Sequence, residues 1–287
     1  MRKPRRLLTK AKAARVAGRK AIVRGKPLNP PAATAAKYSA SLHRLVDAMT
    51  EIARKDIEAF FARPATQAHF AQDESVSYAA SRLVSALEKK FAALFDRRAE
   101  GLSEWLVNSV NKASTSSLHA SLQEMSGGLS MKTSVLNGQM RESLSAATAQ
   151  NVGLIKSIPE QYLHNVEQAV LRSVTTGNGL ADLQPMLEAQ AGITKRRAKM
   201  IAEDQTHKIY SAINRQRMDA LGLTQFEWLH SGGGKHPREL HVSYSGKVFK
   251  FSEPPVIDER TGETGLPGDA PNCRCKMIPV LSSSEAP

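Results

Sequence analysis

The stretch Leu42-His-Arg-Leu-Val-Asp-Ala-Met-Thr-Glu-Ile-Ala53 carries apolar side chains at steps of three and four residues. These side chains are Leu42, Leu45, Val46, Met49 and Ala53. Because an α-helix makes one turn in 3.6 residues, they share one face of a helix. The pattern extends over residues 35–63 and stops at Pro64, which lacks the backbone N–H that a helix needs. The stretch therefore predicts a long helix with one buried face.

Similar apolar stripes recur further along the chain. One begins after Asp73 and contains Leu83, Leu87, Phe91 and Leu94. Gly101 is expected to break that helix, since glycine disfavours helix interiors, and weaker helical patterns follow as far as residue 150. We interpret the stripes as core-facing surfaces rather than as binding grooves. The predicted fold is mainly α, with a long-helix bundle in the N-terminal two thirds followed by a small α+β C-terminal module.

Residues 151–222 are predicted to add further helices to this bundle. The run Asn151-Val-Gly-Leu-Ile-Lys-Ser-Ile-Pro159 is interpreted as a short extended segment, with Pro159 in the first turn of the next helix. After a short helix, Thr194 is expected to cap a separate long helix that Gly222 ends. The region thus reads as several helices joined by short connections.

The composition changes after Gly222, where aromatic and apolar residues alternate with polar ones. Strands are predicted over residues 226–230, 247–251 and 274–281, because alternation with a period of two is typical of a half-buried strand. The chain then divides into four parts. They are a basic, disordered arm (1–31), a helical region (32–150), a second helical region (151–222) and a small α+β module that ends in the Asn-Cys-Arg-Cys motif (223–287).

The positive charge of the chain is concentrated in the arm. Residues 1–31 contain eleven Lys or Arg and no acidic residue, so subtracting these eleven from the net charge of +13 leaves the other 256 residues at +2. Such a segment can neutralise DNA phosphates without reading sequence. The alternative is a solvated tail that promotes solubility or addresses a partner. The candidate DNA-contacting residues are Arg2, Lys3, Arg5, Arg6, Lys10, Lys12, Arg15, Arg19, Lys20, Arg24 and Lys26.

The two cysteines form a Cys273-x-Cys275 pair, which argues against a disulfide framework. In an extended segment both thiols point to one face, and His241 can join them in a tetrahedral zinc site. Several residues remain open as the fourth ligand: His236, Asp258 and Asp269. The simpler alternative is a small domain tied by buried thiols and a hydrogen-bonded histidine. A catalytic Cys–His pair is disfavoured, because no orienting group is apparent.

The order and spacing of residues in the last 130 positions resemble the Mu F-like minor head protein family of tailed bacteriophages, also called the phage head morphogenesis family. Residues 151–222 then correspond to the helical first part of the Mu F-like region. Where members of that family carry Arg, this chain has Glu203. The residues that match the family pattern are Asp204, Gln205, Asn214, Arg217, Trp228, His241, Gly246, Cys273, Arg274 and Cys275.

The resemblance implies a virion protein, bound at the portal vertex inside the capsid and assembled in the host cytoplasm. It further implies a role in head assembly and in genome packaging or ejection. Its implied partners are the portal protein, the scaffold or major capsid protein and double-stranded phage DNA, with no membrane in the resting state. The basic arm would then contact DNA, and the helical half would contact the portal or the scaffold.

Two other classes of function remain open. A metal-dependent nuclease or peptidase would be built on His241, Cys273 and Cys275, but no carboxylate-rich motif stands near His241, so the chain is not expected to be an enzyme. A free nucleic-acid-binding protein would interleave aromatic and basic residues over a folded face, which the near-neutral body does not do. Ser231-Gly-Gly-Gly234 is not a phosphate-binding P-loop, because it lacks the Lys-Ser/Thr ending.

Overall fold

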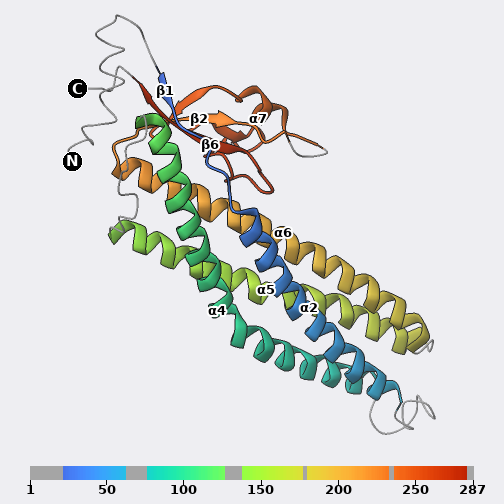
Figure 1. The fold of residues 1–287 in the computed structure, drawn as a ribbon. Coiled ribbons are helices and arrows are strands. Elements are labelled where there is room, and N and C mark those ends of the chain that lie inside the picture. The colour runs from blue at the N-terminus through green and yellow to red at the C-terminus, as the bar shows by residue number, and fades with distance from the viewer. Residues whose placement is uncertain (1–21, 63–75, 127–137, 177–179, 233–235, 283–287) are drawn as a thin grey trace, which may run out of the picture. The chain divides into compact units, whose positions relative to one another are not determined.

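The computed structural model of the protein describes residues 22–62, 76–126, 138–176, 180–232 and 236–282. Four long helices dominate these residues: α2 (Ala32–Phe61), α4 (Val76–Ser126), α5 (Gly138–Thr176) and α6 (Leu180–Ala220). A small module of short strands and one short helix, α7 (Glu239–Ser243), follows them (Figure 1). This confirms the prediction of a mainly α chain with a small α+β module at its end. No helix in the described residues has the length and apolar character needed to cross a membrane.

The described residues divide into two compact units. The helical unit comprises the described residues within 35–105 and 148–202, and the sheet unit comprises those within 22–34, 106–147 and 203–282. Each of the helices α4, α5 and α6 is therefore divided between the two units, with one segment in each. The boundaries do not follow the order of the chain, because each unit gathers segments that are far apart in the sequence.

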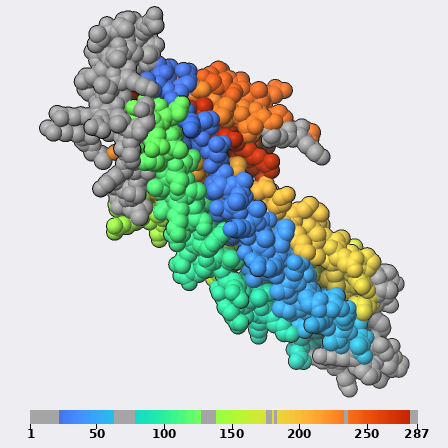
Figure 2. All heavy atoms as spheres, viewed as in Figure 1, coloured from blue at the N-terminus to red at the C-terminus, as the bar shows by residue number. Residues whose placement is uncertain are grey.

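The helical unit buries the stripe that its sequence predicts. Leu42, Val46 and Met49 of α2 are fully buried, and the OH of Tyr38 donates a hydrogen bond to Asn151 Oδ1 of α5 over 3.3 Å. Phe91 of α4 and Tyr162 of α5 stack edge to face, with ring centroids 6.0 Å apart. Helix α2 and the first half of α4 run side by side on the face seen in Figure 2, and Lys90 there pairs with Asp56 over 2.6 Å.

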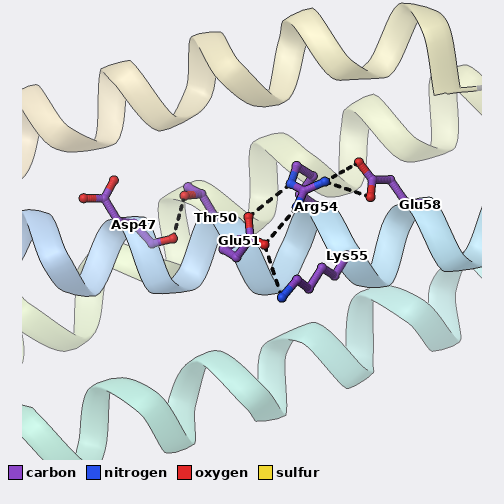
Figure 3. A network of polar contacts seen from close by, with 6 residues as sticks. All are labelled: Asp47, Thr50, Glu51, Arg54, Lys55 and Glu58. Carbon is purple, nitrogen blue, oxygen red and sulfur yellow. Dashed lines mark hydrogen bonds and ion pairs between the residues drawn. The ribbon is translucent and has the colours of Figure 1, made fainter.

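The opposite face of α2 is polar and carries ion pairs between successive turns (Figure 3). Arg54 pairs with Glu51 over 2.8 Å and with Glu58 over 2.7 Å, and Lys55 pairs with Glu51 over 3.3 Å. These residues lie three and four positions apart, which places them on adjacent turns of the helix. Exposed pairs of this kind add little to stability, because solvent screens their attraction. Burial of the apolar face, rather than these pairs, therefore decides where α2 lies.

Two predicted helix boundaries are wrong, because the helices continue through them. Helix α4 passes Gly101 without a break, and α6 passes the predicted cap at Thr194, whose hydroxyl instead donates to the Gln190 carbonyl four residues earlier over 2.8 Å. Buried side chains continue on both sides of each position, including Ala99, Leu106, Leu187 and Ala198. Their burial outweighs the cost of about 1 kcal/mol that glycine adds in a helix.

The extended segment predicted at residues 151–159 is also helical. Helix α5 runs from Gly138 to Thr176 with Pro159 in its interior. Proline normally costs about 3 kcal/mol there, because it removes one hydrogen bond and crowds the preceding turn. Ile155, Ile158 and Tyr162 are all fully buried around it, so this segment lies on the packed face of the helical unit. Packing has overridden the local preference of Pro159.

The sheet unit is built on a four-stranded antiparallel sheet of order β1-β6-β2-β3. These strands are β1 (Ile22–Arg24), β2 (Gln225–Leu229), β3 (Val248–Lys250) and β6 (Lys276–Ser282). A separate two-stranded sheet joins β4 (Val256–Asp258) to β5 (Glu263–Thr264). The strands predicted at 226–230, 247–251 and 274–281 therefore correspond to β2, β3 and β6. Phe226, Trp228 and Val280 are fully buried and fill the core of this unit.

Residues 22–31, which the sequence assigns to the basic arm, belong to the fold. Strand β1 pairs with β6, and the N–H groups of Gly25 and Leu28 donate to the carbonyls of Pro279 and Met277 over 2.9 and 2.8 Å. Leu28 is 1% exposed. The alternation of this short segment is hidden among basic residues, which explains why it reads as part of a disordered arm. Residues 1–21 lie outside the described residues.

Gly222 ends α6 as predicted. Its φ of +74° lies in the left-handed region that glycine tolerates. Its N–H donates to the Asp219 carbonyl over 2.8 Å, and the N–H of Leu223 donates to the Met218 carbonyl over 2.9 Å. This pair of bonds is the Schellman arrangement, which satisfies the last carbonyls of a helix. It turns the chain directly into β2.

Replacing Gly101 with Ala should stabilise the protein by about 0.5–1 kcal/mol, because alanine costs less backbone entropy than glycine in a helix. A Cβ atom at this position meets nothing within 4 Å. Thermal or urea unfolding of the full chain measures the change. Gly25→Ala is the matched control and should destabilise, since its Cβ would collide with Ser121 Oγ. A Gly101→Ala variant less stable than wild type would contradict the continuous helix.

Candidate metal centre

The sheet brings together the two segments that carry the candidate ligands. Strand β6 starts directly after Cys275, and its Met277 pairs with Trp228 of β2. In the connection between β2 and β3, the N–H of Gly246 donates to the Trp228 carbonyl over 2.8 Å, and the glycine has a φ of +82°. Helix α7 lies within this connection and carries His241, whose ring packs edge-on against Trp228 with centroids 5.1 Å apart.

Three buried donor atoms meet at this point. Nδ1 of His241 lies 3.5 Å from Sγ of Cys273 and 3.8 Å from Sγ of Cys275. The three donor atoms all lie within 4.8 Å of one another, and none of the three residues is more than 4% exposed. Nε2–H of His241 donates to the Ile257 carbonyl over 3.1 Å, so the lone pair of Nδ1 faces the thiols. A histidine that binds metal normally has its other nitrogen tied in this way.

The spacing of the donors fits a tetrahedral metal ion. Zinc binds thiolate at about 2.3 Å and imidazole at about 2.0–2.1 Å, which places N and S about 3.6 Å apart in a tetrahedron. The two observed N–S distances, 3.5 and 3.8 Å, bracket this value. The grouping of His241, Cys273 and Cys275 could therefore hold a metal such as zinc.

Without a metal, the three groups shift one another's pKa values. The hydrogen bond between Cys273 and Cys275 lowers the pKa of Cys273. The same bond, together with burial, raises the pKa of Cys275. The hydrogen bond with Cys273 raises the pKa of His241. A metal ion binds deprotonated thiols and a neutral imidazole, so its binding would release protons from these groups.

A cavity of about 570 Å³ opens beside the three donors. It is lined by His230, His236, Arg238, Asn272 and the donors themselves, among others. Of the residues predicted as a fourth ligand, His236 lines this cavity and the two aspartates do not. Asp258 instead pairs with Arg260 over 3.1 Å, and Asp269 accepts the N–H of Leu266 over 2.8 Å.

The family-pattern residues Asn214 and Arg217 lie elsewhere, between α6 and the second half of α4. Arg217 is 3% exposed and donates from Nη2 to Asn111 Oδ1 over 2.8 Å and from Nη1 to Ser114 Oγ over 2.5 Å. The hydroxyl of Ser114 donates to Asn214 Oδ1 over 2.8 Å. Burial lowers the pKa of Arg217. The network holds the two helices together. Gln205, another residue of the family pattern, is also buried, and it donates to Asp204 over 3.4 Å.

The sequence did not predict the partners of these residues, either at the centre or in the Arg217 network. His207 Nδ1–H donates to the Cys273 carbonyl, and Asn111 and Ser114 supply the α4 side of the Arg217 network. A polar residue on a helix gives no sign of a contact with a loop 66 positions away. The departure at Glu203 from the expected family residue has a local counterpart, since Glu203 pairs with Arg274 over 3.0 Å.

Two of the candidate DNA-contacting residues are described, and both have acidic partners on the folded unit. Arg24 of β1 pairs with Glu227 of β2 over 2.5 Å, and Lys26 lies 3.9 Å from Glu124. The other nine, from Arg2 to Lys20, lie outside the described residues. These nine cations are therefore the remaining candidates for a contact with DNA.

Comparison with known proteins finds a similarity over the region that contains this centre. The family model described as "Phage Mu protein F like protein" matches residues 164–278, within the region where the resemblance was expected. An uncharacterized protein of Haemophilus influenzae is 29% identical over 264 residues, which cover 91% of this chain and 56% of that protein. The chain thus spans little more than half the length of this curated relative. No solved structure matches the chain significantly.

Proposed function

We propose that the chain is a minor head protein of a tailed phage, because residues 164–278 match the family described as Phage Mu protein F like protein. Its place is the portal vertex inside the capsid, where it acts in head assembly and in genome packaging or ejection. The observation that carries the proposal is the family match, which includes all three donors of the candidate metal centre. The proposed partners are the portal protein and the scaffold or major capsid protein.

Co-expression of the tagged full chain with the portal protein of the same phage tests this proposal. A complex that survives size-exclusion chromatography at moderate salt is expected, and the portal protein of an unrelated phage is the control. Deleting residues 32–150 is a poor probe of the docking surface, because those residues contribute to both compact units. The absence of any complex at low and moderate salt would count against a portal-bound protein.

The metal centre in this proposal is a structural zinc site. Zinc held by His241, Cys273 and Cys275 would tie α7 to the segment before β6 and so close the small module. Such a metal supplies folding free energy rather than chemistry. The described residues that line the adjacent cavity include no Asp or Glu to act as a general base. This favours a structural site over a metal-dependent nuclease or peptidase.

We assign the fourth coordination position to His236. It lines the cavity that opens beside the three donors, and a structural zinc site is normally closed by four protein ligands. His230 lines the same cavity, but its Nδ1 accepts the N–H of Gly232 over 3.2 Å, so the neutral ring carries its proton on Nε2 and has no free lone pair there. His230 is therefore the matched comparison for His236.

The full chain, purified without chelator, should contain one zinc ion per molecule by mass spectrometry of the metal. Removing the metal should lower the thermal midpoint, since a ligand at 100 times its Kd stabilises by about 2.7 kcal/mol. His236→Ala should weaken zinc retention more than His230→Ala. His164→Ala, an exposed residue of the helical unit, is the neutral control. A wild-type protein that carries no zinc and gains no stability from added zinc would exclude the site.

The basic arm is the proposed DNA contact. Nine Lys or Arg lie between Arg2 and Lys20 with no acidic residue among them. Arg24 and Lys26 are excluded from this set because each has an acidic partner on the sheet unit. Lysine and arginine side chains bind phosphates by releasing condensed counterions, so the contact would be independent of sequence and sensitive to salt.

Replacing these nine cations with serine should abolish binding to duplex DNA, or weaken it by at least a hundredfold, at low salt. The wild-type affinity should fall steeply with salt, with a slope of about −0.9 for each phosphate neutralised. Serine at Lys89, Arg97 and Arg98, three exposed cations of α4, is the control and should change affinity little. Fluorescence anisotropy with two unrelated duplexes measures both effects. If the variant with all nine substitutions binds DNA as tightly as wild type, the DNA contact lies on the folded body instead.

A further inference from the structure

The segment that carries both thiols is fastened to α6 by three consecutive residues. Oδ1 of Asp204 accepts the N–H of Asn272 over 3.0 Å. Nδ1–H of His207 donates to the Cys273 carbonyl over 3.0 Å, and Arg274 Nη2 donates to Glu203 Oε2 over 3.0 Å. The three α6 residues lie at spacings of one and three along the helix, so they present adjacent groups to the same loop. Each successive residue from Asn272 to Arg274 therefore has its own contact on α6.

The Asp204 contact falls at the point where the loop has its most unusual backbone. Asn272 has φ of +56°, the left-handed conformation that is strained for most residues and that asparagine tolerates better than most residues other than glycine. The N–H of Cys273 closes the turn by donating to the Ala270 carbonyl over 3.0 Å. This bend decides the direction in which Cys273 and Cys275 leave the loop. A carboxylate that accepts the N–H of Asn272 stabilises the bend by a charge-assisted hydrogen bond.

The carboxylate of Asp204 is itself held in place. Its Oδ2 accepts Lys208 Nζ over 2.9 Å and Gln205 Nε2 over 3.4 Å, while its Oδ1 faces the loop. Its side chain is only 15% exposed. The contact between Glu203 and Arg274 differs, since those side chains are 36% and 56% exposed. An exposed pair of that kind contributes little, because solvent screens it.

We propose that Asp204 and His207 are positioning residues for the metal centre. They hold the loop in the bend that aims both thiols at Nδ1 of His241 before the metal arrives. Glu203 borders the same loop but contributes little to metal affinity. This inference rests on the zinc site proposed above and adds the residues, outside the ligand set, that determine its affinity. Partners of this kind typically change metal affinity by roughly 10- to 100-fold when they are removed.

Titration of the full-length, metal-free protein with cobalt(II) tests the proposal, because a thiolate–cobalt bond gives its own charge-transfer absorption. Asp204→Ala should bind cobalt and zinc roughly 10- to 100-fold more weakly than wild type. Asp204→Asn should lie between the two, since its amide oxygen still accepts the Asn272 N–H without a charge. Glu203→Gln, on the same helix and facing the same loop, should stay within about twofold of wild type. His207→Ala should weaken binding as Asp204→Ala does.

The outcomes separate the two proposals. A wild-type protein with no charge-transfer band overturns the zinc site and this inference with it. A wild-type band together with unchanged affinity in Asp204→Ala and His207→Ala overturns this inference alone. Circular dichroism of the metal-free variants checks folding, and Asp204→Asn provides a folded test if Asp204→Ala does not fold. A merely structural role would lower the thermal midpoint but leave the metal affinity of the folded protein and its spectrum unchanged.

Discussion

The pairing of β6 with both of its neighbours is the constraint on which the candidate metal centre depends. Strand β6 lies between β1 and β2, and it starts one residue after Cys275. Its register against β2 places Met277 opposite Trp228, the side chain against which the His241 ring packs. A shift of one residue would turn every β6 side chain to the other face of the sheet. The thiols could then no longer face the imidazole, so the site follows from the register.

Local patterns predicted much of the fold, and long-range packing decided the rest. The stripe around Leu42 predicted α2 because helical periodicity is written in neighbouring residues. Gly101 and Pro159 misled in the same way, since each is a local signal for a break. The buried faces of α4 and α5 continue past them, and that burial depends on residues far away in the sequence. Strand β1 was missed because three residues of alternation carry too little signal before their partner is known.

In the candidate site, too, the ligands could be predicted from local sequence and the long-range contacts could not. His241, Cys273 and Cys275 could be chosen from the sequence because a Cys-x-Cys pair and an upstream histidine supply the ligand types that zinc binds. The grouping itself is now seen in the structure. The contacts of Asp204 and His207 with the loop could not be found, because helix polarity does not reveal which distant backbone atom it will meet.

The antiparallel register of β1 with β6 has a consequence for the order of folding. Ile22 pairs with Ser282, so the first described strand and the last are neighbours although almost the entire chain separates them. During synthesis the N-terminal strand emerges from the ribosome long before its partner exists. The four-stranded sheet is therefore completed only after residue 282 has been synthesised, and contacts of such long range form slowly. Until then, the edge of β1 is open to pairing with other chains.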